Sequence, residues 1–119
     1  MSGMPSERCI FCRIVLGEVP ATVVHEEEDL LAFRDLSPQA PEHILLIPKR
    51  HIPSVDGIED EDQAVMGRLV LAARDVARRQ GLAEGGYRLV ANVGEDGGQS
   101  VEHLHLHLLG GRPLSWPPG

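Results

Sequence analysis

HLHLHLL, residues 103–109, is the stretch that decides the fold, because histidine and leucine alternate along it residue by residue. Successive side chains of a β-strand point to opposite faces of a sheet. The alternation therefore predicts a strand whose leucines face a hydrophobic core. His103, His105 and His107 would share the other face, with the middle imidazole flanked by the outer two.

Three histidines on one strand face admit three interpretations. They can form a solvated polar surface. A His-x-His pair can also bind one Zn²⁺, although the third histidine lies one repeat away from such an ion. In the third interpretation, a neutral imidazole attacks a phosphorus atom, which requires one free ring nitrogen and one held by a hydrogen-bond acceptor.

The loop that precedes the histidines favours nucleophilic chemistry. It reads GEDGGQS over residues 94–100. Its glycines allow backbone N–H groups to approach a phosphate closely, and Gln99 and Ser100 add side-chain donors. A glycine-rich turn by itself is usually only a turn. Its place directly before the histidines makes it a candidate phosphate-binding loop.

The rest of the chain predicts an α+β fold, a five-stranded and mainly antiparallel sheet with one long and one short helix. The long helix is predicted from Val65, Leu69 and Val76, which recur at helical spacing. Asp60 is its expected N-cap and Gly81 the residue that ends it. The short helix is expected over residues 10–16. The strands are expected over residues 22–25, 30–33, 43–48, 87–93 and 104–109.

Length and charge limit the function classes. A chain of 119 residues is the size of one domain, here with residues 1–8 as a polar lead-in and residues 110–119 as an irregular tail. The net charge of −7 argues against nucleic acid as a partner but not against a mononucleotide. The N-terminal residues lack a secretory pattern and no apolar run is long enough to span a bilayer, so we expect a cytoplasmic protein.

The sequence resembles the Hint branch of the histidine-triad (HIT) family. The resemblance rests on GGQS, on HLHLHLL and on the ending GGR with WPPG, all within residues 92–119. It extends to FRDLSPQAPEHILLIPKRHI, residues 33–52, and to GYRLVAN, residues 86–92. It implies a homodimer with one sheet continued across both subunits, and a tail over 110–119 that packs near the dimer interface.

The resemblance also implies an activity, hydrolysis of the P–N bond of purine nucleoside 5′-phosphoramidates without a catalytic cofactor. His105 would become transiently nucleotidylated, His103 and His107 would support it, and His43 would be the fourth active-site histidine. Ser100 or His107 would help to protonate the leaving nitrogen. The implied nucleotide-binding residues are Phe33, Asp35, Leu36, Asn92, Gly98, Gln99, Ser100 and Trp116.

Two other functions stay open. The first is dinucleoside polyphosphate hydrolysis or nucleotidyl transfer, but that branch of the family tends to replace the third histidine by glutamine, and His107 argues against it. The second is a nucleotide-binding scaffold protein whose hydrolysis is incidental.

Cys9 and Cys12 form a C-x-x-C pair, which is half of a metal site or simply two buried thiols. The resemblance supplies two more ligands, His51 and His103, and implies a structural Zn²⁺ that ties the N-terminal segment to the sheet. Such a closed site stabilises a fold and performs no chemistry.

Overall fold

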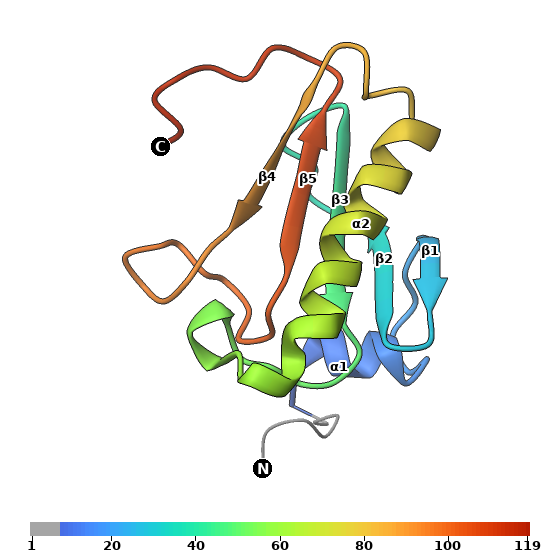
Figure 1. Ribbon diagram of the computed structural model, residues 1–119, viewed down its shortest axis with the longest axis vertical. Helices are drawn as coiled ribbons and strands as arrows, with labels where there is room; N and C mark the ends of the chain where they lie inside the picture. Colours follow the sequence, from blue (N-terminus) through green and yellow to red (C-terminus); the bar gives the residue numbers. More distant parts are fainter. Residues whose placement is uncertain (1–7) are drawn as a thin grey trace.

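The computed structural model describes residues 8–119 (Figure 1). Of the predicted lead-in over residues 1–8, only residue 8 is among the described residues. The elements follow one another as α1 (Ile10–Val15), β1 (Val23–Glu27), β2 (Leu30–Arg34), β3 (Glu42–Pro48), two 3₁₀ turns (Val55–Gly57 and Asp60–Asp62), α2 (Gln63–Arg79), β4 (Tyr87–Ala91) and β5 (Leu106–Gly110).

The predicted α+β fold is confirmed. The five strands form one sheet in the order β1-β2-β3-β5-β4, and every neighbouring pair is antiparallel. The last strand in sequence, β5, lies between β3 and β4, so the histidine-rich segment enters the sheet away from its edges. Among residues 8–119, no helix is both long and apolar enough to cross a membrane.

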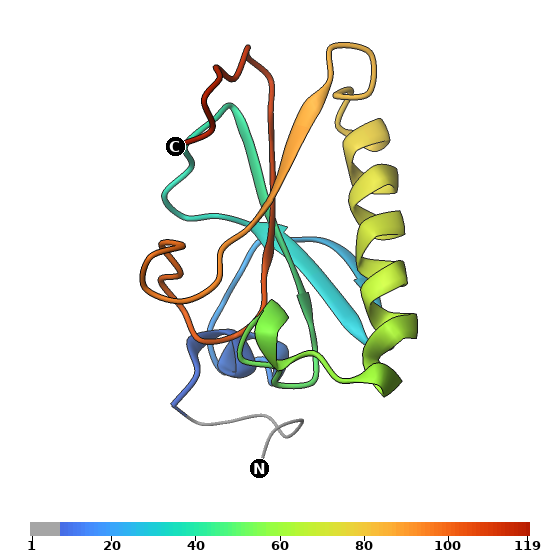
Figure 2. The same ribbon diagram turned by 60° about the vertical axis from the view of Figure 1, so that its left-hand side comes forward.

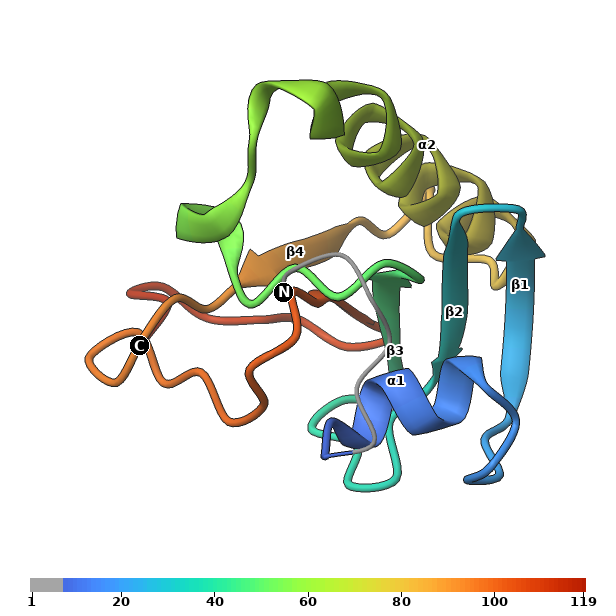
Figure 3. The same ribbon diagram turned by 90° about the horizontal axis from the view of Figure 1, so that it is seen from below.

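The sheet separates two hydrophobic cores. The long helix α2 lies against one face and the short helix α1 against the other (Figure 3). In β3, Ile44 and Leu46 face α2, whereas Leu45 and Ile47 belong to the core on the α1 side. Figure 2 shows α2 on the opposite side of the sheet from the loop that leads into β5.

The alternation of leucine and histidine has the predicted consequence. Leu104 and Leu108 are buried in the core beneath α2. His103 and His105 lie on the other side, where both imidazoles contact the Phe11 ring in T-shaped arrangements. The paired part of β5 begins only at Leu106, because the Leu104 N–H donates instead to the Ile52 carbonyl at 2.6 Å.

The prediction of Asp60 as the N-cap of the long helix is wrong. A 3₁₀ turn precedes α2, and a reciprocal capping box of Glu59 and Asp62 closes that turn. The buried Asp62 carboxylate accepts the Glu59 N–H at 2.9 Å and pairs with Arg50. The helix therefore begins at Gln63. Its predicted stop is confirmed, since Gly81 adopts φ +75°, a conformation that favours glycine.

Candidate functional site

A cavity of about 260 Å³ opens on the α1 side of the sheet. It brings together six of the residues predicted for the site, although they come from two stretches that are distant in the sequence, residues 33–36 and 100–107. Its lining is mostly apolar, and the imidazoles of His105 and His107 lie in its wall. The predicted residues that line it are Phe33, Asp35, Leu36, Ser100, His105 and His107.

The hydrogen bonds of His105 determine which of its ring nitrogens carries the proton. Nδ1 lies 2.7 Å from the His103 carbonyl oxygen. A carbonyl only accepts, so Nδ1–H donates and Nε2 of the neutral ring keeps its lone pair. The arrangement is the one that a nucleophilic imidazole requires.

His43 and His107 form a chain of hydrogen bonds behind the cavity. The Gln39 N–H donates to His43 Nδ1 at 3.0 Å, so the neutral ring carries its proton on Nε2. That proton is donated to His107 Nδ1 at 2.8 Å, which leaves the His107 proton on Nε2. Burial lowers the pKa of both rings, the pKa of His107 to about 4. Both imidazoles are therefore neutral at pH 7.

The same bonds decide against a metal ion at this place. Asp35, His43 and His107 offer ligand atoms that lie within 4.8 Å of one another. His43 Nε2 nevertheless carries a proton, because its Nδ1 already accepts the Gln39 N–H. A protonated nitrogen has no lone pair for a metal, so His43 donates to His107 instead, with an Asp35 carboxylate oxygen 3.5 Å from the same nitrogen.

The low pKa of His107 predicts acid sensitivity. The unfolded chain binds a proton on this ring below pH 6.5, whereas the folded protein binds it only near pH 4. In that window the unfolded state holds more protons, so the free energy of unfolding falls as the pH is lowered, by up to about 1.4 kcal/mol per pH unit. In urea titrations between pH 7 and 4.5, His107→Gln should reduce this slope. The control His25→Gln, outside the cavity, should keep it, and equal slopes in all three proteins would contradict the assignment.

The loop before β5 is held in place by two predicted nucleotide-binding residues. Gln99 Nε2 donates to the Pro53 carbonyl at 2.7 Å and to the Val101 carbonyl at 2.9 Å, and its Oε1 accepts the Gly94 N–H. Asn92 Nδ2 donates to the Gly97 carbonyl at 2.7 Å. Both amides thus bond to protein and shape the loop, and their contact with a phosphate stays a prediction.

Gly97 occupies the tightest position of this loop. A Cβ there would lie 2.2 Å from the Val93 carbonyl oxygen, a backbone atom that cannot swing aside. We expect Gly97→Ala to displace the loop at a cost of roughly 1–3 kcal/mol. It should also weaken the purine-nucleotide binding that the resemblance implies, measured by calorimetry with AMP. Gly85→Ala is the matched control, because a Cβ at Gly85 meets nothing within 4 Å. Wild-type AMP affinity in both variants would contradict the role given to the loop.

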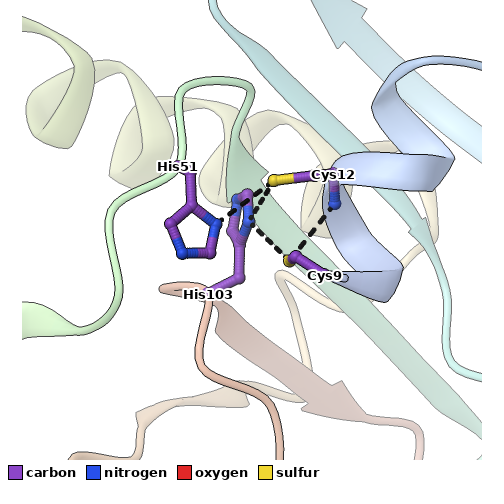
Figure 4. A group of neighbouring side chains, drawn as sticks. All are labelled: Cys9, Cys12, His51 and His103. Atoms are coloured by element: carbon purple, nitrogen blue, oxygen red, sulfur yellow. Dashed lines mark hydrogen bonds between the residues drawn. The ribbon is translucent and has the colours of Figure 1, made fainter. Parts of the chain in front are cut away.

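Four side chains lie close enough together to bind a metal ion, and they are the four that the resemblance implies (Figure 4). Cys9 and Cys12 come from the start of α1, His51 from the segment after β3, and His103 from the segment before β5. These four residues are called the metal cluster below. His103 Nδ1 lies 3.3 Å from the sulfur of Cys9 and 3.5 Å from that of Cys12. The Cys12 sulfur lies 3.2 Å from His51 Nδ1.

These distances fit a tetrahedral site. One sulfur and one nitrogen ligand of the same Zn²⁺ lie about 3.6 Å apart. His103 Nε2–H donates to the Pro48 carbonyl at 2.8 Å, so Nδ1 presents its lone pair to the sulfurs. Burial lowers the pKa of His103 to about 4, which keeps the ring neutral as a ligand must be.

The chain matches the family model of the HIT domain over residues 16–114. It belongs to the HIT family. An uncharacterised HIT-like protein of Synechococcus elongatus is 53% identical over 114 residues, which are 96% of this chain and 99% of that protein.

Solved HIT structures share the fold. The HIT family hydrolase from Legionella pneumophila superimposes with a TM-score of 0.92 at 53% identity, over 94% of this chain and 100% of that one. The histidine triad nucleotide-binding protein from Candida albicans gives a TM-score of 0.79 at 30% identity, over 92% of this chain and 82% of that one.

The HIT sequence motifs did not identify every residue of the site. The α1 residues Ile10, Phe11 and Ile14, together with Leu45 and Val101, also line the cavity. Their only sequence signal is apolarity, which does not distinguish a cavity wall from a core.

Some predicted residues lie outside the cavity wall. His43 lies behind His107, His103 is fully buried in the metal cluster, and Gly98 belongs to the loop. Trp116 is 82% exposed, so among residues 8–119 it finds little to pack against. Its part in nucleotide binding stays a prediction.

Proposed function

We propose that this HIT protein is a hydrolase that cleaves the P–N bond of purine nucleoside 5′-phosphoramidates through a nucleotidyl-His105 intermediate. The observation that carries the proposal is the bond from His105 Nδ1–H to the His103 carbonyl, which leaves Nε2 as a nucleophile in the wall of the cavity. The name of the Legionella relative, a hydrolase, and that of the Candida relative, a nucleotide-binding protein, agree with it.

The reaction proceeds in two displacements. The Nε2 lone pair of His105 forms a bond to phosphorus, the P–N bond to the leaving amine breaks, and the amine nitrogen takes up a proton. Water then attacks phosphorus, the bond to His105 breaks, and the nucleoside monophosphate leaves. The protein needs no cofactor for either step.

The neighbouring groups support both steps. His107 carries its proton on Nε2 and lines the cavity, so it can donate to a phosphoryl oxygen or to the departing nitrogen. Ser100 offers a hydroxyl in the same wall. The Asp35 carboxylate would accept hydrogen bonds from the ribose hydroxyls. The apolar side chains of Phe33 and Leu36 would flank the base.

Intact-protein mass spectrometry tests this function. Adenosine 5′-phosphoramidate is mixed with the protein and the reaction is quenched without acid, because a phosphoramidate is acid-labile. We expect a transient adenylyl adduct on the wild-type protein and none on His105→Ala. Turnover without an adduct would overturn the covalent mechanism, and tight nucleotide binding without turnover would favour a scaffold protein.

We also propose that the metal cluster binds Zn²⁺ as a structural ion. Two thiolates and two neutral imidazoles are the donor set that Zn²⁺ prefers in closed sites. Its ligands would join α1 to two segments that are distant in the sequence. When bound, the ion supplies cross-linking and takes no part in the reaction.

We further propose a homodimer with the tail over residues 110–119 near its interface. Strand β4 is an edge of the sheet among residues 8–119, and Tyr87 and Leu89 are exposed on it. Such an edge invites pairing with a second copy. Light scattering at low micromolar concentration should give twice the chain mass of 13.0 kDa, and a mass of 13.0 kDa would refute the dimer.

A further inference from the structure

Phe11 connects the metal cluster to the candidate nucleophile. It lies in α1 between Cys9 and Cys12 and is 7% exposed. Its ring makes T-shaped contacts with the imidazoles of His103 and His105, at centroid distances of 5.9 Å and 5.2 Å. The same ring lines the cavity. One side chain thus touches a metal-cluster residue, the nucleophile and the space where a nucleotide would bind.

His103 provides a second connection. Its imidazole belongs to the metal cluster, and its backbone carbonyl accepts the Nδ1–H of His105. Any change in the position of His103 therefore alters the hydrogen bond that fixes the tautomer of His105.

We propose that Phe11 is a positioning residue, through which a metal ion bound by Cys9, Cys12, His51 and His103 holds His105 ready for attack. The proposal rests on the proposed function of His105. It adds that metal binding and nucleotide binding are energetically coupled, although no metal ligand lines the cavity.

The size of α1 explains why the coupling is expected. The helix has six residues, too few to be stable by itself, so its place depends on packing and on whatever its two cysteines bind. With the metal bound, Cys9 and Cys12 are joined to His103, and Phe11 is held against both imidazoles. Without it, α1 can move, and Phe11 and the cavity wall move with it.

Coupling of this kind is reciprocal. If zinc raises the affinity for AMP by some factor, AMP raises the affinity for zinc by the same factor. We expect chelator-stripped protein to bind AMP about tenfold more weakly than zinc-loaded protein in calorimetry. Saturating AMP should raise the zinc affinity by the same factor, measured by competition with a chromophoric chelator. Neither readout depends on turnover.

The decisive variant keeps the metal and removes the connection. Phe11→Ala should retain one zinc per chain by elemental analysis but should lose the coupling between zinc and AMP. Its His105 ring should no longer be held in a single orientation and tautomer. The His105 ring is followed by the ¹⁵N resonances of its two nitrogens, which report the tautomer. The comparison of His105 resonances uses zinc-loaded protein alone and so does not require the stripped protein to stay folded.

Phe33→Ala is the matched control. Phe33 packs against Phe11 with a ring-centroid distance of 5.5 Å and lines the same cavity, but its ring does not stack against the imidazole of His103 or His105. We expect it to weaken AMP binding while leaving the coupling and the His105 resonances as in the wild type.

The possible results separate this inference from the function on which it rests. Equal AMP affinities with and without zinc, or wild-type His105 resonances in Phe11→Ala, would overturn the positioning role and leave the adduct on His105 standing. Absence of the adduct on zinc-loaded wild-type protein would overturn the function and this inference together.

Discussion

His105→Ala is expected to lower kcat for adenosine 5′-phosphoramidate by roughly 10⁵-fold, the largest effect of any substitution in this chain. Among residues 8–119, His105 is the one histidine of the cavity wall whose Nδ1–H donates to a carbonyl and whose Nε2 lone pair is therefore free, and the variant loses that lone pair. The Kd for AMP should change only a few-fold, because the apolar cavity and Asp35 remain. Single-turnover kinetics together with calorimetry would separate the two quantities.

His25→Ala is the control for this experiment. His25 bonds to Glu27 at 2.7 Å on the far edge strand, outside the cavity, and its loss should leave kcat unchanged. A His105→Ala variant that retained even a tenth of the wild-type kcat would refute nucleophilic catalysis. A large rise in the Kd for AMP with little change in kcat would instead assign His105 to binding.

Loss of the metal cluster is expected to have the largest effect on stability. Cys12→Ala removes a fully buried ligand, and the variant should bind no zinc. A ligand present at about a thousand times its Kd stabilises the folded state by about 4 kcal/mol, so we expect Tm to fall by roughly 10–20 °C. Calorimetric unfolding of zinc-loaded proteins would measure the shift.

A chelator provides the internal control. It should lower the Tm of the wild-type protein nearly to that of Cys12→Ala and should leave the variant itself unaffected. Wild-type protein that carries zinc and unfolds at the same temperature after stripping would exclude a structural role for the ion.

Local patterns predicted most of the fold. The alternation in HLHLHLL assigned leucines and histidines to opposite sides correctly, because strand geometry requires only neighbouring residues. The point where pairing starts was not predictable, since it depends on the bond from Leu104 N–H to Ile52, a residue half the chain away. The N-cap error has a similar cause, because Arg50 helps to hold Asp62 in the capping box.

The candidate site was predicted less completely. The four metal-cluster residues came from the family resemblance, since C-x-x-C alone supplies two ligands, and the structure brings all four together. Phe11 was missed because its importance arises from the packing of α1 against the sheet. The bond from Gln39 to His43 was missed because a backbone N–H carries no sequence signal.

Substitutions in the two hydrophobic cores should differ in their effect on the cavity. Leu45 and Leu46 are neighbours in β3, yet Leu45 lines the cavity and Leu46 packs beneath α2. Substitutions on the α2 side can therefore raise the stability reserve of the protein without touching the chemistry, and distant changes of this kind add independently. A laboratory that evolves this protein toward new substrates could first stabilise the α2 layer, and then use that reserve to tolerate disruptive substitutions on the α1 side.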